Sequence, residues 1–482
     1  MSSLLVLPII LPFATAVIIL LVKSNVKGSS NIALSSAVLQ IIACGTIFYQ
    51  VHRNGIFASQ MGNWPAPFGI TLVADHLSAV MVVITAVINL AVVAYSRADI
   101  GASLVKRGYY PLMQTLVGGI CGAFLTGDLF NLYVWFEVML IASFGLLVLG
   151  QDRNQLDGGV KDVVINLCST LLLITGIGLL YGLTGTLNMA DLHVKVQAID
   201  NKGLLTAVAM LFMGAFGIKS ALFPLFFWLP ASYHTPPVSV SAIFAGLLTK
   251  VGVYALIRMF TLVFTVNVPY THGVLIVVAA LTMITGVLGA AAHNEFRRIL
   301  SFHIISQVGY MILGLALNTT LALAGAVFYL IHHIIVKANL FLVSGVVQRL
   351  SGSFELSRIG GIYRRNGWIA LCFFISAFSL AGFPPLSGFW AKMILIRASL
   401  EIHHYLVAGI AAAVGFLTVY SMTKIWGEVF WKPAPRADTV DEVSLAAGPS
   451  GWMMTPIAGL VILTVIIGFG AEAFVEIALH AA

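Results

Sequence analysis

Apolar runs of about 20 residues, separated by short polar loops, follow one another along the whole chain of 482 residues. A membrane-spanning helix needs roughly 20 consecutive apolar residues, because the hydrocarbon core of a bilayer is about 30 Å thick. The pattern therefore predicts an all-α polytopic membrane protein. We expect about fourteen spans, at residues 3–22, 32–51, 71–95, 110–126, 129–149, 162–183, 204–231, 238–260, 272–291, 299–317, 321–347, 367–400, 404–430 and 453–475.

The polar residues are too few for a separate catalytic domain outside the membrane. Only 9% of the residues are charged, whereas soluble domains carry about 25%. The four cysteines lie inside apolar runs, with no spacing that suggests a disulfide or a metal site. The sequence thus predicts a transporter-like protein without a cofactor or metal, and the bilayer is its expected environment.

Basic residues are distributed unequally between the two sets of loops. One set has only four, which are Arg53, Lys195, Lys202 and Arg258. The other set has fifteen, which are Lys23, Lys27, Arg97, Lys106, Arg107, Arg153, Lys161, Arg297, Arg298, Arg349, Arg358, Arg364, Arg365, Lys432 and Arg436. Loops rich in Lys and Arg stay in the cytoplasm, so both termini are expected outside it. The bias also explains the net charge of +7, and no nucleic-acid partner is needed.

Two lysines lie within apolar sequence in FGIKSALFPLFFWLPASYHTPPVSVSAIFAGLLTK, which runs from Phe216 to Lys250. An intramembrane lysine is energetically costly and usually faces the bundle interior or a water-filled path. Pro224 removes a backbone donor and should break the seventh helix close to Lys219. The alternative is that a lysine extends from a helix end to the interface, but both lysines lie well inside their apolar runs. The stretch therefore predicts an ion path beside a broken helix.

A second stretch, FSLAGFPPLSGFWAKM in the twelfth expected helix, resembles the first. It contains Pro384 and Pro385, which predict another break, followed by Lys392. The two stretches are five helices apart, and an odd number of helices per repeat inverts the topology. We expect helices 1–3 at 1–100, inverted repeats at 105–262 and 270–430, and a loop with the last helix at 431–482. The alternative is that Pro and Gly are simply frequent in membrane helices.

Glu137 is an acidic residue near the middle of the fifth expected helix. Lys219 has the same expected depth in a neighbouring helix, and a nearby lysine favours the charged form of a carboxylate. The alternative is an ion pair that only fixes packing, but such buried pairs are poor stabilisers.

Histidines mark the tenth and eleventh expected helices. His303 and Gln307 are four residues apart on one face, and with Ser306 they can hold a water chain or be hydrogen-bonded core residues. In YLIHHIIVKANLF, four-residue spacing puts His333 and Lys337 on one stripe with Tyr329. His332 lies off this stripe and is expected to face the seventh or eighth helix.

The histidines favour a proton relay over a metal site. Histidine titrates near neutral pH, whereas His332 and His333 are adjacent on a helix, point apart and have no third ligand nearby. The expected row of stations is Glu137, Lys219, Lys250, His333 with Lys337, and Lys392. A helix is about 10 Å across, so water and hydroxyl groups must bridge the stations.

These residues together resemble a known family. The fifth-helix glutamate, the broken seventh and twelfth helices, HTPPVSVSA and FRRILSFHIISQVGY are similar to the antiporter-like subunits shared by respiratory complex I and the Mrp (multiple resistance and pH) cation/proton antiporters. The similarity covers nearly the whole chain. It is greatest to the D-type branch of the Mrp antiporters, because the M-type chain of complex I usually has a glutamate in place of Lys392.

The resemblance implies roles that composition and spacing do not give. The implied proton-translocation residues are Glu137 and Lys219 as an ion pair, Lys250 as the central lysine, His332, His333 and Lys337 as a relay, and Lys392 as the terminal station. It also implies a bacterial cell membrane, H⁺ and Na⁺ as the ions, and a hetero-oligomer with the other Mrp antiporter components, which are designated A, B, C, E, F and G. The alternatives are a proton-pumping subunit of NADH-quinone oxidoreductase or a membrane hydrogenase, and a scaffold that carries no ion. The charged row argues against a scaffold.

Overall fold

The structure is a computed structural model that describes residues 2–22, 25–434 and 448–482. The loop residues Lys23 and Arg436, and part of the expected terminal segment 431–482, lie outside this part. The first helices are η1 (Ser2–Val6), α1 (Leu7–Val22), α2 (Val26–Asn54), η2 (Met61–Asn63), α3 (His76–Asp99), α4 (Ala102–Lys106), α5 (Tyr109–Leu125), α6 (Leu129–Leu147) and α7 (Arg153–Thr184). A small hairpin lies between α2 and α3 in the sequence.

The rest of the chain is helical in the same way. The middle helices are α8 (Met189–Gln197), α9 (Lys202–Lys219), α10 (Trp228–Ser232), α11 (Val238–Ile243), η3 (Phe244–Leu248), α12 (Thr249–Arg258) and η4 (Met259–Val263). The last are α13 (Val268–Ala292), α14 (Phe296–Leu317), α15 (Thr320–Ser351), η5 (Leu356–Arg358), α16 (Ile362–Arg365), α17 (Gly367–Ala381), α18 (Ser387–Glu401), α19 (Tyr405–Ile425), η6 (Trp426–Trp431), α20 (Gly451–Phe469) and α21 (Ala471–Ala481).

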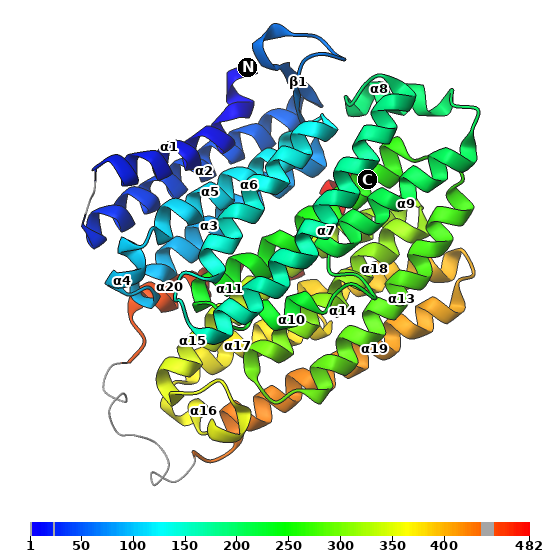
Figure 1. Cartoon of the computed structure of the whole chain (residues 1–482). Coiled ribbons are helices and arrows are strands. Elements are labelled where there is room, and N and C mark those ends of the chain that lie inside the picture. The colour runs from blue at the N-terminus through cyan, green and yellow to red at the C-terminus, as the bar shows by residue number, and fades with distance from the viewer. Residues whose placement is uncertain (1, 23–24, 435–447) are drawn as a thin grey trace.

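The chain is an all-α polytopic membrane protein. Within the described ranges, twelve helical segments are long and apolar enough to cross a membrane. The expected spans at 110–126 and 367–400 form shorter helices, namely α5 and the pair α17 and α18. In Figure 1, α1 and α2 form one flank of the bundle, and α13 and α19 form the opposite flank.

The core of the bundle consists of α14, α15 and the segment Val238–Val263. The apolar window of α15 is completely buried, and those of α14 and Val238–Val263 are almost completely buried. About two fifths or less of the corresponding windows of α1, α2, α7, α13 and α19 is buried. Exposed apolar side chains on these outer helices suit contact with lipid, so the polar side chains of the core are shielded on all sides.

Both helix breaks contain the prolines that the sequence singled out. Pro224 lies between the end of α9 at Lys219 and the start of α10 at Trp228. Pro384 and Pro385 lie between α17 and α18. A glycine allows close backbone approach at each break. A Cβ on Gly252 would lie 3.0 Å from the Lys219 carbonyl carbon, and one on Gly388 would lie 1.8 Å from the Ser379 carbonyl oxygen.

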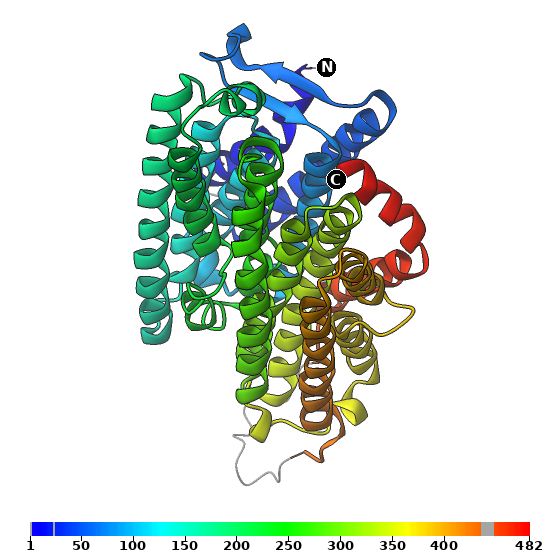
Figure 2. The same cartoon turned by 90° about the vertical axis from the view of Figure 1, so that its right-hand side faces the viewer.

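Three local features differ from the expectations. α7 begins at Arg153 and not near residue 162, so Lys161 is in a helix and not in a loop. The loop expected near 185–202 contains α8. Two strands, β1 (Phe57–Gln60) and β2 (Thr71–Ala74), pair antiparallel in a hairpin that periodicity did not reveal. Figure 2 shows both ends of the chain at the same end of the bundle as this hairpin, and the loops around α16 lie at the other end.

Candidate functional site

Lys219, the last residue of α9, lies in the interior without a hydrogen bond. Its side chain is 5% exposed, and Nζ has no hydrogen-bond partner in the part of the chain that the structure describes. Nζ lies 4.9 Å from the centroid of the Phe136 ring. Lys219 borders a cavity of about 30 Å³ together with Asp162, Asn166 and Tyr233. A water molecule needs about 10–15 Å³ of such volume, so the cavity holds one or two.

Glu137 on α6 does not form the direct ion pair with Lys219 that the resemblance implied. Among the described residues, the two side chains do not approach within the 4.0 Å that defines an ion pair. Glu137 Oε1 instead accepts a hydrogen bond of 2.7 Å from Thr170 Oγ1 on α7. Glu137 still lies close enough to Lys219 to interact electrostatically. The carboxylate is therefore bound to α7 and lies near the lysine without contacting it.

Asp162 on α7 is a site residue that the sequence reasoning missed. It is buried, its Oδ1 has no hydrogen-bond partner among the described residues, and it lines the cavity of Lys219. Asp162, Asn166 and Thr170 are spaced by four and share one face of α7. This stripe was detectable in the sequence. It was overlooked because the helix was expected to start at residue 162, which would place the carboxylate at the interface.

Lys250 occupies the centre of the bundle. Its side chain is completely buried, and Nζ donates to the carbonyl oxygen of Ala245 five residues earlier. Ala245 belongs to η3, a π-helical turn directly before α12. Such turns occur frequently at functional sites. The wider turn brings a carbonyl group within reach of the lysine, so the ammonium group is hydrogen-bonded without a carboxylate.

On α15, the buried polar side chains face two different neighbours. Tyr329 Oη donates to Gln307 Oε1 of α14, and Lys337 Nζ donates to Leu300 O over 3.4 Å. Both ring nitrogens of His333 are buried without a partner among the described residues. His333 is within electrostatic range of Lys250, which places it between the central lysine and the rest of the row.

His332 was expected to face the seventh or eighth helix, and this was wrong. Its Nδ1 lies 2.8 Å from Ser387 Oγ, at the start of α18 beyond the second helix break. The adjacent positions on α15 point apart, as expected from helix geometry. The side chain that leaves the stripe is therefore directed to the terminal station and not to the first one.

The second helix break places Lys392 at the end of the row. Lys392 Nζ donates to Ala381 O over 2.8 Å and lies 5.3 Å from the centroid of the Tyr310 ring. The supporting residues of α14 are all buried. His303 Nε2 lies 2.8 Å from Ser421 Oγ of α19, and Ser306 Oγ has no partner in the described ranges.

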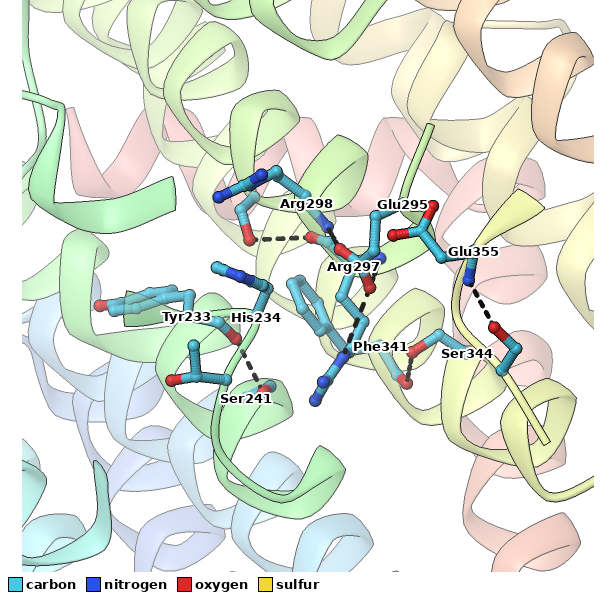
Figure 3. Close-up of polar contacts among 12 residues, drawn as sticks. Tyr233, His234, Ser241, Glu295, Arg297, Arg298, Phe341, Ser344 and Glu355 are labelled. Carbon is cyan, nitrogen blue, oxygen red and sulfur yellow. Dashed lines mark hydrogen bonds and ion pairs between the residues drawn. The ribbon is translucent and has the colours of Figure 1, made fainter. Parts of the chain in front are cut away.

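A polar vestibule opens at the end of the bundle that carries the basic loops. It has a volume of about 720 Å³, and its walls include Gln155, His234, Glu295 and Arg297. Figure 3 shows His234 beside Arg297 and Arg298, with Glu295 at the start of the same helix. Burial, Arg298 and Arg297 lower the pKa of His234 to about 4, so its ring is neutral at pH 7.

One helix, α7, contributes both to the wall of the vestibule and to the cavity beside Lys219. Gln155 is on the wall, and its Nε2 donates to Thr235 O over 3.4 Å. Asp162 is seven residues further along α7, which is about 10 Å.

Burial, the largest influence, raises the pKa of Glu295 in the vestibule despite the neighbouring Arg297. The vestibule therefore combines ionisable groups of both signs outside the buried row.

At the opposite end of the bundle, Arg258 and Asp75 form an ion pair. Arg258 Nη2 lies 2.5 Å from Asp75 Oδ1, and both side chains are nearly 20% exposed. Burial alone would raise the pKa of Asp75, but the Arg258 cation and hydrogen bonds from Arg258 and Ser78 lower it on balance. The residues described here include no group of three or more His, Cys, Asp or Glu side chains that could hold a metal ion.

Comparison with known proteins identifies the family. The family model described as NADH:quinone oxidoreductase/Mrp antiporter, TM, matches residues 126–418. The chain is 45% identical over 482 residues to the D subunit of the Na(+)/H(+) antiporter of Alkalihalophilus pseudofirmus, covering all of this chain and 97% of the relative. It is 38% identical over 477 residues to the protein of the same name from Bacillus subtilis, covering 98% and 95%.

Solved structures agree with this assignment. A chain in the Mrp complex from Dietzia sp. has a TM-score of 0.92 and 31% identity, with 100% of this chain and 97% of that chain covered. A chain of an archaeal membrane-bound sulfane sulfur reductase shares the fold, with a TM-score of 0.91 and 24% identity. The protein therefore belongs to the family of antiporter-like membrane subunits that NADH:quinone oxidoreductase and the Mrp antiporters share.

Within this family the chain falls on the antiporter side, with the D-type relatives. It is a cation/proton antiporter subunit and a transporter component, not a catalytic enzyme. Its structural counterpart comes from a multi-subunit complex, and the chain is a component of a hetero-oligomer in the membrane.

Proposed function

We propose that this protein passes protons along its buried row, in an antiporter that exchanges them for Na⁺. The observation that carries the proposal is Lys219, a buried lysine without a hydrogen-bond partner among the described residues, next to a cavity large enough for water. Asp162 lines the same cavity and Glu137 lies within electrostatic range. A lysine between two carboxylates can receive a proton from one side and release it on the other when water bridges the gaps.

Protons enter this row from the vestibule. The path runs from Gln155 and His234 to Asp162, crosses the cavity to Lys219, and is coupled to Glu137 through Thr170. Because His234 is neutral at pH 7, it does not add a further positive charge beside Arg297 and Arg298 at the mouth of the path.

From Lys219 the row continues through the core. Lys250 is the central station, and His333 and Lys337 connect it to the second helix break. Both ends of that break are in contact with the row. Lys392 donates to Ala381 at the end of α17, and His332 lies beside Ser387 at the start of α18. The single buried waters and hydroxyl groups that this requires are common in membrane-protein interiors. His303, Ser306 and Gln307 support the path from α14.

The proposed assembly contains the Mrp components A, B, C, E, F and G in a bacterial cell membrane. The names of the two bacillar relatives and the Dietzia complex support an Mrp-type assembly. We further propose extracytoplasmic termini and inverted repeats at 105–262 and 270–430. Both chain ends lie opposite the basic loops (Figure 2), and each proposed repeat contains one broken helix with a lysine. A reporter fused at Ala482 that is active only in the cytoplasm would overturn this orientation.

The experiment that tests the function uses the whole operon in inverted membrane vesicles. Addition of Na⁺ should release the pH gradient, as measured with a fluorescent weak base. Glu137→Gln should abolish this exchange while the complex still assembles on native gels. Exchange at the wild-type rate would refute the proposal. Na⁺-independent proton pumping that requires an electron donor would favour the oxidoreductase alternative.

A further inference from the structure

An apolar groove lies between α3 and α20, away from the buried row. It has a volume of about 750 Å³, which is the size of a typical ligand site. Its lining includes Val87, Leu90 and Ala94 of α3 and Thr455, Pro456 and Gly459 of α20. A Cβ on Gly459 would meet no atom within 4 Å. The small residues of α20 thus leave an open groove beside the helix.

The groove has the length of one bilayer leaflet. On α20, the lining residues Gly451 and Leu460 are nine residues apart, which is about 14 Å. This is nearly half of the roughly 30 Å hydrocarbon core. The groove begins near the middle of α3 and ends where the helix reaches the basic side of the bundle. An acyl chain from that leaflet has this extent, whereas a helix of a partner protein would continue across the whole core.

Positive charge lies at the interfacial end of the groove. Arg97 is 4.1 Å from the ring centroid of Trp452, which lines the groove. Arg349 donates to Ala98 O over 3.1 Å and to Met453 Sδ over 3.3 Å. These acceptors directly follow Arg97 and Trp452 in the sequence, so both arginines lie where the end of α3 meets the start of α20.

Asp99 lies within electrostatic range of Arg349 but is not in contact with it as an ion pair. Among the described residues, Arg97 and Arg349 form no ion pair. The side chain of Asp99, at the end of α3, accepts hydrogen bonds from the backbone and hydroxyl groups of Ser239. Basic pockets between membrane helices on the cytoplasmic side bind anionic lipid head groups, and tryptophan prefers the interface.

We propose that this groove is a binding site for an anionic diacyl phospholipid, with an acyl chain along Leu90 and Gly459 and the phosphate beside Arg97 and Arg349. The site goes beyond the proposed ion path and shares no residue with it. Hydrocarbon contacts provide most of the affinity, because Thr455 is the polar exception among the lining side chains. The arginines select an anionic head group over a zwitterionic one.

The test uses the assembled complex, reconstituted in an equal mixture of dioleoyl phosphatidylglycerol and dioleoyl phosphatidylcholine. Lipids retained after detergent extraction are counted by mass spectrometry. Gly459→Phe fills the groove and should remove one retained lipid per copy of this chain. Gly45→Phe is the matched control, because Gly45 is also an exposed helical glycine with no atom within 4 Å of its Cβ. Arg97→Gln should keep the lipid but reduce the preference for phosphatidylglycerol about five-fold.

A photocrosslinker at the exposed position Thr455 distinguishes the possible occupants. Thr455→p-benzoylphenylalanine should form a product with phospholipid. A crosslink to another polypeptide would overturn the proposal, because the groove would then be an interface with a partner protein. Equal lipid retention in the wild type, Gly459→Phe and Gly45→Phe would also overturn it, and an unchanged head-group preference in Arg97→Gln would refute the role of the arginine.

Discussion

The two helix breaks place a lysine in very different surroundings. At the first break, Lys219 is the last residue of α9 and shares a small cavity with Asp162. Its Nζ has no hydrogen-bond partner in the described part of the chain. At the second break, Lys392 lies inside α18 and donates to Ala381 O at the end of α17. It borders a groove of about 490 Å³ in which the lining residues include no carboxylate.

This difference indicates that the two halves control the charge of their lysine in different ways. The first lysine has proton acceptors within its own chain, so its charge can change together with theirs. The second is held by the partial negative charge of a helix C-terminus, which favours a cation. Its groove opens on the outer surface between α18 and α19, where another protein of the complex can contribute a charged group. The first half is thus self-sufficient, and the second half depends on its surroundings.

The strongest test of the comparison removes each lysine. We expect Lys219→Ala and Lys392→Ala each to lower Na⁺-dependent exchange by about 100-fold, the scale of a lost acid–base group. Both halves would then need their lysine although its surroundings differ. Exchange is measured in inverted vesicles with protein levels matched by immunoblot. Normal exchange in Lys392→Ala would reduce the second half to a scaffold and end the comparison.

Lys250, the central lysine of the row, tests whether a fixed charge is enough. Arginine remains protonated at any relevant pH, whereas a buried lysine can release its proton. We expect Lys250→Arg to lower exchange more than tenfold, almost as much as Lys250→Ala. Nearly full exchange with arginine and none with alanine would show a static electrostatic role. Native-gel analysis of assembly checks whether the larger guanidinium group disturbs the complex.

Asp162 tests the claim that the first half carries its own proton acceptor. We expect Asp162→Asn to lower exchange about tenfold. The change should add little to Lys219→Ala, because residues of one unit are not additive. Asp157→Asn is the matched control, since Asp157 is an exposed residue of the same helix paired with Lys161. Equal effects of the two asparagine variants would exclude a specific role for Asp162.

The smallest expected effect concerns two ion pairs that lie outside the buried row. Asp75 pairs with Arg258 in a mostly buried site, whereas Arg397 and Glu401 form an exposed pair. We expect Asp75→Asn to lower the stability by about 2 kcal/mol, between buried and surface values, and Glu401→Gln to change it little. Thermal melting of the purified complex measures both.

The Asp75 contribution also has a defined pH dependence. The pKa of Asp75 is lower in the folded protein than in the unfolded chain, where it is about 3.9. The stabilisation is therefore complete above that value and is lost as the pH falls through the folded pKa. The melting difference between wild type and Asp75→Asn should be constant from about pH 6 to about pH 9. A difference that changes within this range would contradict the assignment.

Apolar length and intramembrane charge were sufficient to predict the class of fold and most of the row. Pro224, Pro384 and Pro385 lie between helices, as expected from the loss of a backbone donor at proline. Lys219 and Lys250 are buried because they lie well inside apolar runs, too far from the interface for the side chain to reach water. These properties depend on local sequence and on the thickness of the bilayer, so they can be inferred without knowing which helices are neighbours.

Contacts between helices were not predictable in the same way. Asp162 was overlooked because polar residues such as Asp157 and Lys161 hid the true start of α7 at Arg153. His332 was assigned to the wrong neighbour because a helical wheel gives a direction but not what lies there. Glu137 bonds to Thr170 and not to Lys219 because side-chain distances of a few ångströms depend on how α6, α7 and α9 pack.

The complete enclosure of α15 has a consequence for how the protein is made. This helix carries His332, His333 and Lys337 in its middle, and one lysine at the centre of a lone helix costs about 3 kcal/mol on insertion. Alone in lipid, α15 would also leave the ring nitrogens of two histidines without partners. Its passage from the ribosome into the bilayer is therefore favourable only beside helices already made, with α14 as the first available companion. The order of synthesis then protects the ion path, because a span with three ionisable residues at its centre is never required to face lipid by itself.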